Sequence, residues 1–430
     1  MQYNISSKGK ISILDGADGI LNWFSEKRLG MFVHWGIYAV GGLHEQEIWR
    51  CGTPMVQYRR YAEKFNPVNF DPARWLDFFQ ENGMEYLVFT AKHHDGFCMF
   101  DSAATDFKIT ATPFGRDVFR MLADECHRRN FPLVAYYSVV DWHHPAYPNC
   151  GRHHEIVTDP SGHDLAAYKE YLCTQIRELC TNYGTLHGIW WDMNTAGLHD
   201  EEINKMIHTL QPQAMINDRG PGRGDFATSE RSAVDQDVPG NNVEGCDSVG
   251  RFSWGFRRNE DYYSPRFIKT KIALMLARGG NFLLNAGPDA DGNFTPEARR
   301  VLSAVGTWYR QVRPGLTACP RPEFSRPRQP VTGSPDGDEL FWILEEPAPS
   351  HQFELPGKNL PPLAEAELLN DHTSLPVDNR ALYREPLFPS RRAVLDVPTD
   401  ANEIPVLRVK FQQKIDSREH ASPENPAYRL

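Results

Sequence analysis

An apolar segment that ends in a carboxylate offers the first candidate for chemistry in this sequence. The segment GIWWDMN, residues 188–194, places Asp192 immediately after two tryptophans. Because side chains alternate along a strand, Trp190 and Asp192 would share one face while Trp191 would lie on the other. An aromatic ring beside a carboxylate suits a sugar, whose C–H face packs on the ring while the carboxylate meets the anomeric carbon. The alternative is that Asp192 caps the helix expected in HDEEINKMIH, but the intervening loop makes this less natural.

Glycoside hydrolysis needs a second carboxylate, because one group acts as nucleophile or base while the other donates a proton. The segment GDFATSE supplies Glu230, and Asp225 lies nearby. A single glutamate at the end of a strand is more often a partner in a surface ion pair. Glu230 is nevertheless the candidate, because other polar residues, including Arg219 just before it, are expected at the same end of the fold.

Histidines supply either metal ligands or hydrogen bonds. His34 follows the first apolar segment, and His93 and His94 are adjacent in AKHHDGF, where strand alternation sends them to opposite faces unless the strand is twisted or bulged. A metal site that also used Asp95 would usually show an HxH pair or an HExxH motif, and the sequence has neither. We therefore expect neutral histidines that hydrogen-bond the hydroxyls of a ligand, with no metal and no cofactor.

These residues need a scaffold that brings distant parts of the chain together. Over about three hundred residues, short apolar strands alternate with amphipathic helices, which is typical of an α/β fold whose parallel sheet is covered on both faces. The expected strands are LGMFVHWG, MEYLVFTAKHH, FPLVAYYSVVDW, HGIWWDM, AMINDR, FATSE and NFLLNAGP. The expected helices are ARWLDFFQENG, DVFRMLADECHRRN, DLAAYKEYLCTQIRELC, DEEINKMIHTLQ and PRFIKTKIALMLARGG.

Two architectures fit this alternation: an open, doubly wound sheet and a closed (β/α)8 barrel. Only a barrel gathers the carboxyl ends of all its strands at one mouth, and polar residues fall near most of the expected strand ends. These residues are His34, His93, His94, Asp141, Asp192, Arg219 and Glu230. Because no GxGxxG follows the first strand and no GKS/T loop occurs, nucleotide binding is disfavoured. We predict a catalytic (β/α)8 barrel over residues 1–316.

The composition changes after about residue 316. The proline-rich stretch RPGLTACPRPEFSRPRQPVTGSPDGDE indicates a linker or an irregular entry into a second domain. Short strand-like runs follow, namely LFWILEE, RAVLDVP and IPVLRVKFQ. They predict a small β-sandwich over residues 317–430.

Charge and cysteine usage limit the classes of partner. The formal net charge is −10 and no long Lys/Arg run occurs, so nucleic acid and membranes are not expected partners. The eight cysteines are scattered without a CxxC pair, which indicates reduced thiols. The first residues, MQYNISSKGKISILDG, lack the apolar core of a signal peptide. We expect a cytoplasmic protein.

Together, the motifs resemble those of the α-L-fucosidases, family 29 of the glycoside hydrolases. The similar segments follow the order of the family, from about residue 29 to residue 295: MFVHWGIYAV, AKHHDGFCMFDS, YYSVVDW, GIWWD, INDRGPGRGDFATSE and ARGGNFLLNAGPDADG. The resemblance implies a retaining exo-glycosidase that acts on terminal α-L-fucosyl residues of an oligosaccharide or glycoconjugate. It implies Asp192 as the nucleophile and Glu230 as the acid/base, in a pair about 5–5.5 Å apart. The alternatives are a metal-dependent barrel hydrolase and a catalytically silent sugar-binding relative.

The resemblance also implies which side chains hold the sugar. One tyrosine of Tyr136 and Tyr137 is expected in the pocket, and we predict Tyr137. The other implied binding residues are His34, His93, His94, Trp190, Arg219 and Trp254.

The chain departs from the family pattern at three places. The family shows Glu followed directly by Trp after the first strand, whereas HEQEIWR offers Glu45 or Glu47, and we predict Glu47 with Trp49. A second family glutamate follows a Trp, whereas Glu244 here follows a valine, and Glu244 is the rival of Glu230 as acid/base. The third departure is Met193, which follows Asp192 where a small or polar residue is common.

Overall fold

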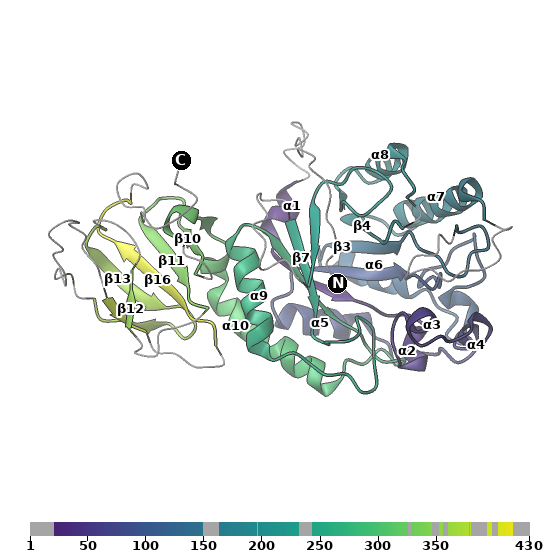
Figure 1. Cartoon of the computed structure of the whole chain (residues 1–430), viewed down its shortest axis with the longest axis horizontal. Helices are drawn as coiled ribbons and strands as arrows, with labels where there is room; N and C mark the ends of the chain where they lie inside the picture. The colour runs from purple at the N-terminus through teal and green to yellow at the C-terminus, as the bar shows by residue number, and fades with distance from the viewer. Residues whose placement is uncertain are drawn as a thin grey trace.

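A computed structural model describes most of the chain outside its two ends. The described residues are 21–148, 163–195, 197–231, 243–325, 329–345, 352–355, 360–377, 379, 394–397 and 403–415. An eight-stranded sheet with surrounding helices forms one part, and antiparallel sheets form the other (Figure 1).

The large sheet is a parallel barrel, as predicted. Its strands lie in the order β5-β4-β3-β2-β1-β8-β7-β6. A parallel bridge between Asn217, just after β5, and Phe226, just before β6, joins the two ends of this order. The strands are β1 (Leu29–Val33), β2 (Tyr86–Lys92), β3 (Leu133–Ser138), β4 (Gly188–Asp192), β5 (Met215–Ile216), β6 (Ala227–Glu230), β7 (Val243–Ser248) and β8 (Asn281–Ala286).

Strand β7, with the sequence VEGCDS, is the barrel strand that the sequence analysis missed. It contains Glu244 and Asp247, so it lacks the continuous apolar run expected of a buried strand, yet all of its residues are buried. Both carboxylates have partners far away in the sequence: Tyr86 and Trp190 donate to Glu244, and Lys271 donates to Asp247. These long-range contacts make burial of the two carboxylates possible.

Helices surround the barrel, and those of ten or more residues begin at side-chain caps that the sequence supplies. The helices are α1 (Leu21–Glu26), α2 (Tyr38–Gly41), α3 (Glu47–Arg50), α4 (Met55–Arg59), α5 (Pro72–Glu81), α6 (Val118–Arg128), α7 (Leu165–Asn182), α8 (Glu201–Leu210), α9 (Pro265–Ala277) and α10 (Pro296–Leu316). Asp200 caps α8 by accepting from the backbone N–H of Glu202. Asp192 therefore does not serve as that cap.

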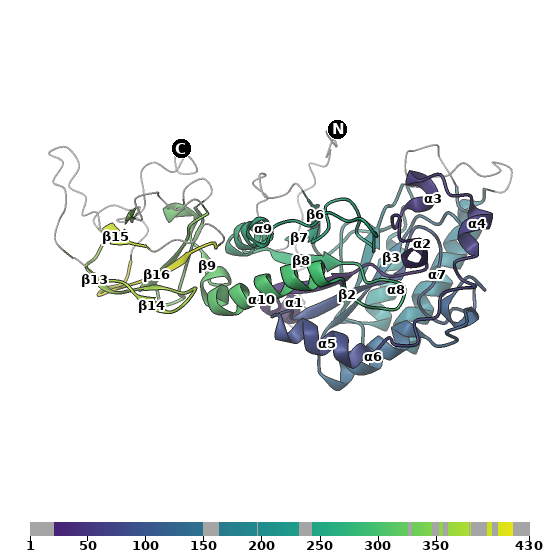
Figure 2. The same ribbon diagram turned by 90° about the horizontal axis from the view of Figure 1, so that it is seen from below.

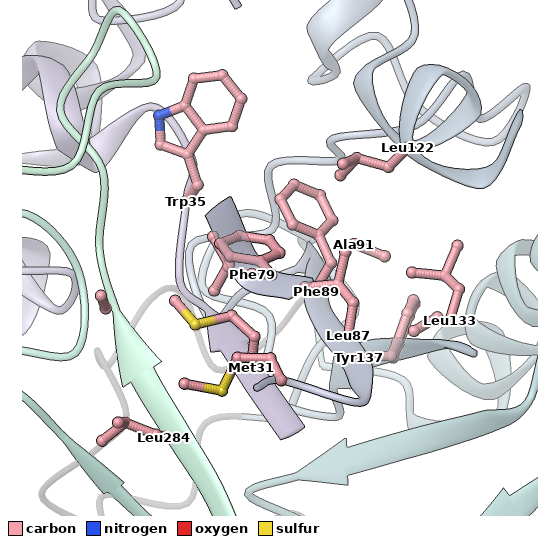
Figure 3. Close-up of a cluster of buried hydrophobic side chains, with 14 of the residues drawn as sticks. Met31, Trp35, Phe79, Leu87, Phe89, Ala91, Leu122, Leu133, Tyr137 and Leu284 are labelled. Atoms are coloured by element: carbon pink, nitrogen blue, oxygen red, sulfur yellow. The ribbon is translucent and has the colours of Figure 1, made fainter. Parts of the chain in front are cut away.

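Alternation along the strands divides the core into two layers. Phe32, Val88 and Trp190 point into the barrel, where α1 closes the lower end with Trp23 and Phe24. Met31, Leu87 and Phe89 point outward and pack under the helices, as Figure 3 shows. The inner layer supports the mouth of the barrel from below.

The C-terminal region carries the predicted β-sandwich. One antiparallel sheet has the order β14-β13-β16-β11-β10-β9, and a second pairs β12 with β15. The strands are β9 (Cys319–Pro320), β10 (Val331–Gly333), β11 (Glu339–Ile343), β12 (Gln352–Glu354), β13 (Leu363–Leu368), β14 (Thr373–Ser374), β15 (Val394–Asp396) and β16 (Val406–Phe411). A short 3-10 helix at Pro322–Phe324 follows β9, and another, at Ile109–Ala111, lies in the barrel part between β2 and α6.

Helices α9 and α10 lie between the barrel and these sheets (Figures 1 and 2). The indole of Trp308 on α10 donates to the carbonyl of Ile404 at 3.0 Å, which ties the two parts together. Helix α10 ends at Leu316 and β9 begins at Cys319. The domain boundary after residue 316 stays a prediction. Among the described helices, none is both long and apolar enough to cross a bilayer.

Candidate active site

Side chains that lie on seven barrel strands or shortly after them meet at the carboxyl edge of the barrel. Because the carboxyl ends of parallel strands in a closed barrel share one rim, residues far apart in sequence become neighbours. Asp192 is the last residue of β4 and Glu230 is the last residue of β6. Their neighbours are His34 after β1, His93 and His94 after β2, Tyr136 within β3, Arg219 after β5 and Trp254 after β7.

The carboxylate of Asp192 is held by donors on both oxygens. The hydroxyl of Tyr136 donates to Oδ2 at 2.7 Å, and Nη1 of Arg219 donates to Oδ1 at 3.2 Å. Nε2 of His94 lies 3.7 Å from Oδ2. The side chain remains 13% exposed, so it is fixed in direction and still open to a ligand.

Arg219 bridges the two candidate catalytic carboxylates. Its Nη1 atom lies 3.2 Å from Asp192 and 3.1 Å from Oε2 of Glu230, while Nε donates to Thr228 at 2.7 Å. Burial alone would lower the pKa of Arg219, but the charges of Glu230 and Asp192 raise it, so the guanidinium stays charged. Since one nitrogen contacts both carboxylates, their nearest oxygens are closer than the roughly 6.5–9.5 Å typical of inverting pairs.

The two candidate acid/base residues occupy different environments. The side chain of Glu230 is 42% exposed at the mouth, whereas Glu244 is 1% exposed within the barrel. Tyr86 donates to one oxygen of Glu244 at 2.6 Å and Trp190 donates to the other at 2.9 Å. Burial raises the pKa of Glu244 to about 7, against the opposing effect of these two hydrogen bonds. The geometry favours Glu230, and the assignment stays a prediction.

The three histidines form one connected group at the mouth. Nδ1 of His34 lies 2.7 Å from Oδ1 of Asn285, and Nδ1 of His94 lies 2.6 Å from the Ser138 hydroxyl. The ring centroids of His93 and His94 are 4.1 Å apart. Both reach the site because β2 ends at Lys92, after a register shift against β3, so alternation no longer separates them.

Burial keeps the histidines available as neutral hydrogen-bonding groups. It lowers the pKa of His34 and lowers that of His93 well below its usual value. Asp95 is turned away, with its carboxylate accepting from the Tyr58 hydroxyl at 2.6 Å. Within the described ranges, no group of three or more His, Cys, Asp or Glu side chains is arranged to hold a metal ion.

The tyrosine at the site is Tyr136, so the prediction of Tyr137 is wrong. The hydroxyl of Tyr137 donates to Gln175 on α7 at 2.6 Å, and its ring lies in the outer apolar layer (Figure 3). In the register of β3 and β4, Tyr136 pairs with Trp190 and Tyr137 pairs with Trp191. Trp190 was already predicted to face inward, so the correct register between these two strands would have identified Tyr136.

The prediction of Glu47 also requires correction, because Glu45 is the glutamate next to the site. Glu45 accepts from the Ser253 hydroxyl and from the backbone N–H of Trp254 at 3.0 Å, and its charge raises the pKa of His34 against the effect of burial. Glu47 begins α3 and accepts from the Tyr61 hydroxyl at 2.9 Å. The spacing in HEQEIWR gave no signal of where α3 would begin.

Trp49 lies in α3, and its part in holding the sugar stays a prediction. It packs, partly buried, against the outer core, and the guanidinium of Arg50 lies 5.3 Å from its ring centroid. Trp254 is the half-buried aromatic beside the histidines, with its ring centroid 5.4 Å from that of His34. Trp190 lies deeper, 3% exposed, with its ring stacked on Tyr136.

Comparisons with known proteins agree on one family. The family model described as "Alpha-L-fucosidase" matches residues 14–312. The human tissue alpha-L-fucosidase is 29% identical over 323 residues, which are 66% of this chain and 66% of the human protein. The match thus spans about two thirds of that relative's length.

Solved structures extend this similarity over the whole fold. Alpha-L-fucosidase isoenzyme 1 from Paenibacillus thiaminolyticus has a TM-score of 0.79 and 31% identity, covering 92% of this chain and 99% of that one. An alpha-L-fucosidase from Bacteroides thetaiotaomicron, 23% identical, has a TM-score of 0.78 and covers 96% of this chain and 99% of its own, which supports the fold.

Proposed function

The chain belongs to the α-L-fucosidase family, and from that premise we propose that it is a retaining exo-glycosidase that removes terminal α-L-fucosyl residues from glycans. The single observation that carries the proposal is the contact of Arg219 Nη1 with both Asp192 and Glu230. This contact supports a nucleophile and an acid/base whose carboxyl groups are close together, as in retaining glycosidases, where they are about 5–5.5 Å apart, and not as in inverting ones. The substrate would be a fucosylated oligosaccharide or glycoconjugate. The cytoplasmic location stays a prediction from the sequence.

The first step forms a fucosyl-enzyme. An oxygen of Asp192 attacks the anomeric carbon while the bond from that carbon to the leaving oxygen breaks, and Glu230 gives its proton to the leaving oxygen. Before attack, Tyr136 and Arg219 hold the carboxylate of Asp192 in one orientation. Because these donors are in place beforehand, little reorganisation is needed as charge moves.

The second step releases fucose. Glu230, now ionised, takes a proton from water, the water oxygen attacks the same carbon, and the bond to Asp192 breaks. Two displacements at one carbon give net retention of configuration. The rings of His93 and Trp254 both lie next to that of His34. In the proposed arrangement the sugar hydroxyls lie against His34 and His93, since neutral imidazoles can both donate and accept hydrogen bonds.

The proposed function is tested by incubating the protein with 4-nitrophenyl α-L-fucoside and recording nitrophenolate release together with the anomeric proton signal by NMR. We expect release, with α-L-fucose appearing before the β anomer. First appearance of the β anomer would contradict the retaining mechanism. If neither this substrate nor a panel of fucosylated oligosaccharides released fucose, the proposed activity would be wrong.

Tyr136 and Tyr137 form a matched pair for testing the orientation of the nucleophile. Tyr136→Phe removes a hydrogen bond to a charged group, typically about 1.5–3 kcal/mol, so kcat/KM should fall about 10- to 100-fold. Tyr137→Phe removes the bond to Gln175 in the outer layer and should leave kcat/KM within about threefold. Steady-state kinetics on the aryl fucoside measure both values. Equal losses of kcat/KM in the two variants would show that the Tyr136 hydroxyl does not orient the nucleophile.

A further inference from the structure

Glu244 is a buried carboxyl group that the proposed mechanism does not use. It lies near the start of β7, one level below the mouth: Glu244 is paired with Thr228 on β6, whereas Glu230 is paired with Cys246. The small cavity beside it is otherwise lined by aromatic and apolar side chains, including Trp23, Phe24, Val88, Val134 and Met215. A carboxyl group in such surroundings is costly unless its oxygens are hydrogen-bonded.

Both oxygens of Glu244 have donors, which come from two other strands. The hydroxyl of Tyr86 on β2 donates to Oε1 at 2.6 Å, and the indole Nε1 of Trp190 on β4 donates to Oε2 at 2.9 Å. Glu244 therefore links β7 to β2 and β4 across the inside of the barrel. The indole of Trp190 has two broad orientations about χ2, and the hydrogen bond from Nε1 to Glu244 selects one of them.

The indole of Trp190 contacts the two groups that hold Asp192. The ring of Tyr136 stacks on it, with centroids 5.6 Å apart and planes inclined by 16°. The guanidinium carbon of Arg219 lies 5.1 Å from its ring centroid. Tyr136 and Arg219 are the donors to the two oxygens of Asp192.

We propose that Glu244 is a positioning residue, which fixes the Trp190 indole and through it the Tyr136 hydroxyl and the Arg219 guanidinium on the nucleophile. This inference rests on the proposed fucosidase function. An acid/base role is disfavoured because Glu244 is 1% exposed and both its oxygens accept from protein donors below the mouth. Its effect on the reaction is therefore transmitted through Trp190.

The proposal predicts a particular order among variants of Glu244. Glu244→Gln keeps an oxygen that accepts from Trp190, and its amide can donate to the Tyr86 hydroxyl, so kcat should stay within about threefold. Glu244→Leu removes the acceptor, and kcat should fall about 10- to 100-fold with little change in KM, equally for the 4-nitrophenyl and the methyl fucoside. The loss is independent of the leaving group because proton donation is untouched.

Trp190→Phe and Tyr86→Phe separate the two hydrogen bonds of the same carboxyl group. Trp190→Phe keeps an aromatic ring but removes the indole N–H, and should reproduce most of the loss seen in Glu244→Leu. Adding Glu244→Leu to Trp190→Phe should cost less than about twofold more, because the two changes break the same contact. Tyr86→Phe should cost less than Trp190→Phe.

The contact itself is measured without turnover by NMR. The indole N–H signal of Trp190, assigned by its loss in Trp190→Phe, should exchange slowly with solvent in the wild type and in Glu244→Gln, and faster in Glu244→Leu. If the wild-type protein were inactive while this pattern held, the proposed function would fail and the contact would stand. Full additivity of Glu244→Leu with Trp190→Phe, unchanged exchange in Glu244→Leu, or a loss confined to poor leaving groups would each overturn the positioning role. If Glu244→Leu does not fold, Trp190→Phe breaks the same contact from the other side, and a kcat within about threefold of wild type in that variant would overturn the positioning role.

Discussion

Asp192→Gly is expected to reduce kcat/KM for 4-nitrophenyl α-L-fucoside by at least about 10³-fold, because it removes the group that forms the covalent intermediate. The donors that held the carboxylate remain in place. Tyr136, Arg219 and His94 would surround the vacated space, at the positions from which they contact Asp192 in the wild type. A small anion can occupy such a space and attack the anomeric carbon from the same face.

Added azide should therefore restore part of the turnover of Asp192→Gly and give β-L-fucosyl azide, identified by NMR. The control is Asp200→Gly, the same substitution eight residues along the chain, at the N-cap of α8. Exchanging a capping aspartate for glycine typically costs only a few tenths of a kcal/mol, so activity should be close to wild type. Substantial activity in Asp192→Gly without azide, or an α-configured azide product, would contradict the nucleophile assignment.

Glu230→Ala should produce the second large effect, and its size should depend on the leaving group. Nitrophenolate leaves without protonation, whereas a sugar alkoxide needs a proton, so the loss should be about 10²- to 10⁴-fold on natural fucosides and much smaller in the first step with the aryl fucoside. The second step lacks its base, so the fucosyl-enzyme should accumulate and nitrophenolate should appear as a burst. Absorbance after rapid mixing measures the burst of nitrophenolate, and mass spectrometry of the intact protein detects the fucosyl-enzyme.

The control for Glu230→Ala is the corresponding change at the rival carboxyl group. If Glu244→Ala were inactive on natural linkages while Glu230→Ala stayed near wild type, the acid/base assignment would have to move to Glu244. A leaving-group effect that is confined to Glu230 variants would support Glu230 as the acid/base. This is the result expected from the structure, in which Glu230 is 42% exposed at the mouth and Glu244 is 1% exposed inside the barrel.

The order of apolar strands and amphipathic helices predicted an α/β fold, the polar residues near the expected strand ends favoured a barrel over an open sheet, and the short strand-like runs after residue 316 predicted the β-sandwich. These features depend on local periodicity, which a sequence shows directly. The position of Asp192 at the end of β4, inward with Trp190, follows from alternation within one strand. Strand β7 was missed because Glu244 and Asp247 break the apolar pattern, and their partners Tyr86, Trp190 and Lys271 come from other parts of the chain.

The composition of the site beyond Asp192 was decided by tertiary structure. Alternation shows that Tyr136 and Tyr137 lie on opposite faces, but only the register against β4 decides that Tyr136 meets Asp192. After a strand ends, periodicity no longer applies, so the choice of Glu45 over Glu47 depends on where α3 begins and on how the Trp254 loop folds back. The difference between Glu230 and Glu244 is one of depth in the barrel. It arises from the register of β6 against β7, which pairs Glu230 with Cys246 but Glu244 with Thr228, and alternation within either strand alone does not show that register.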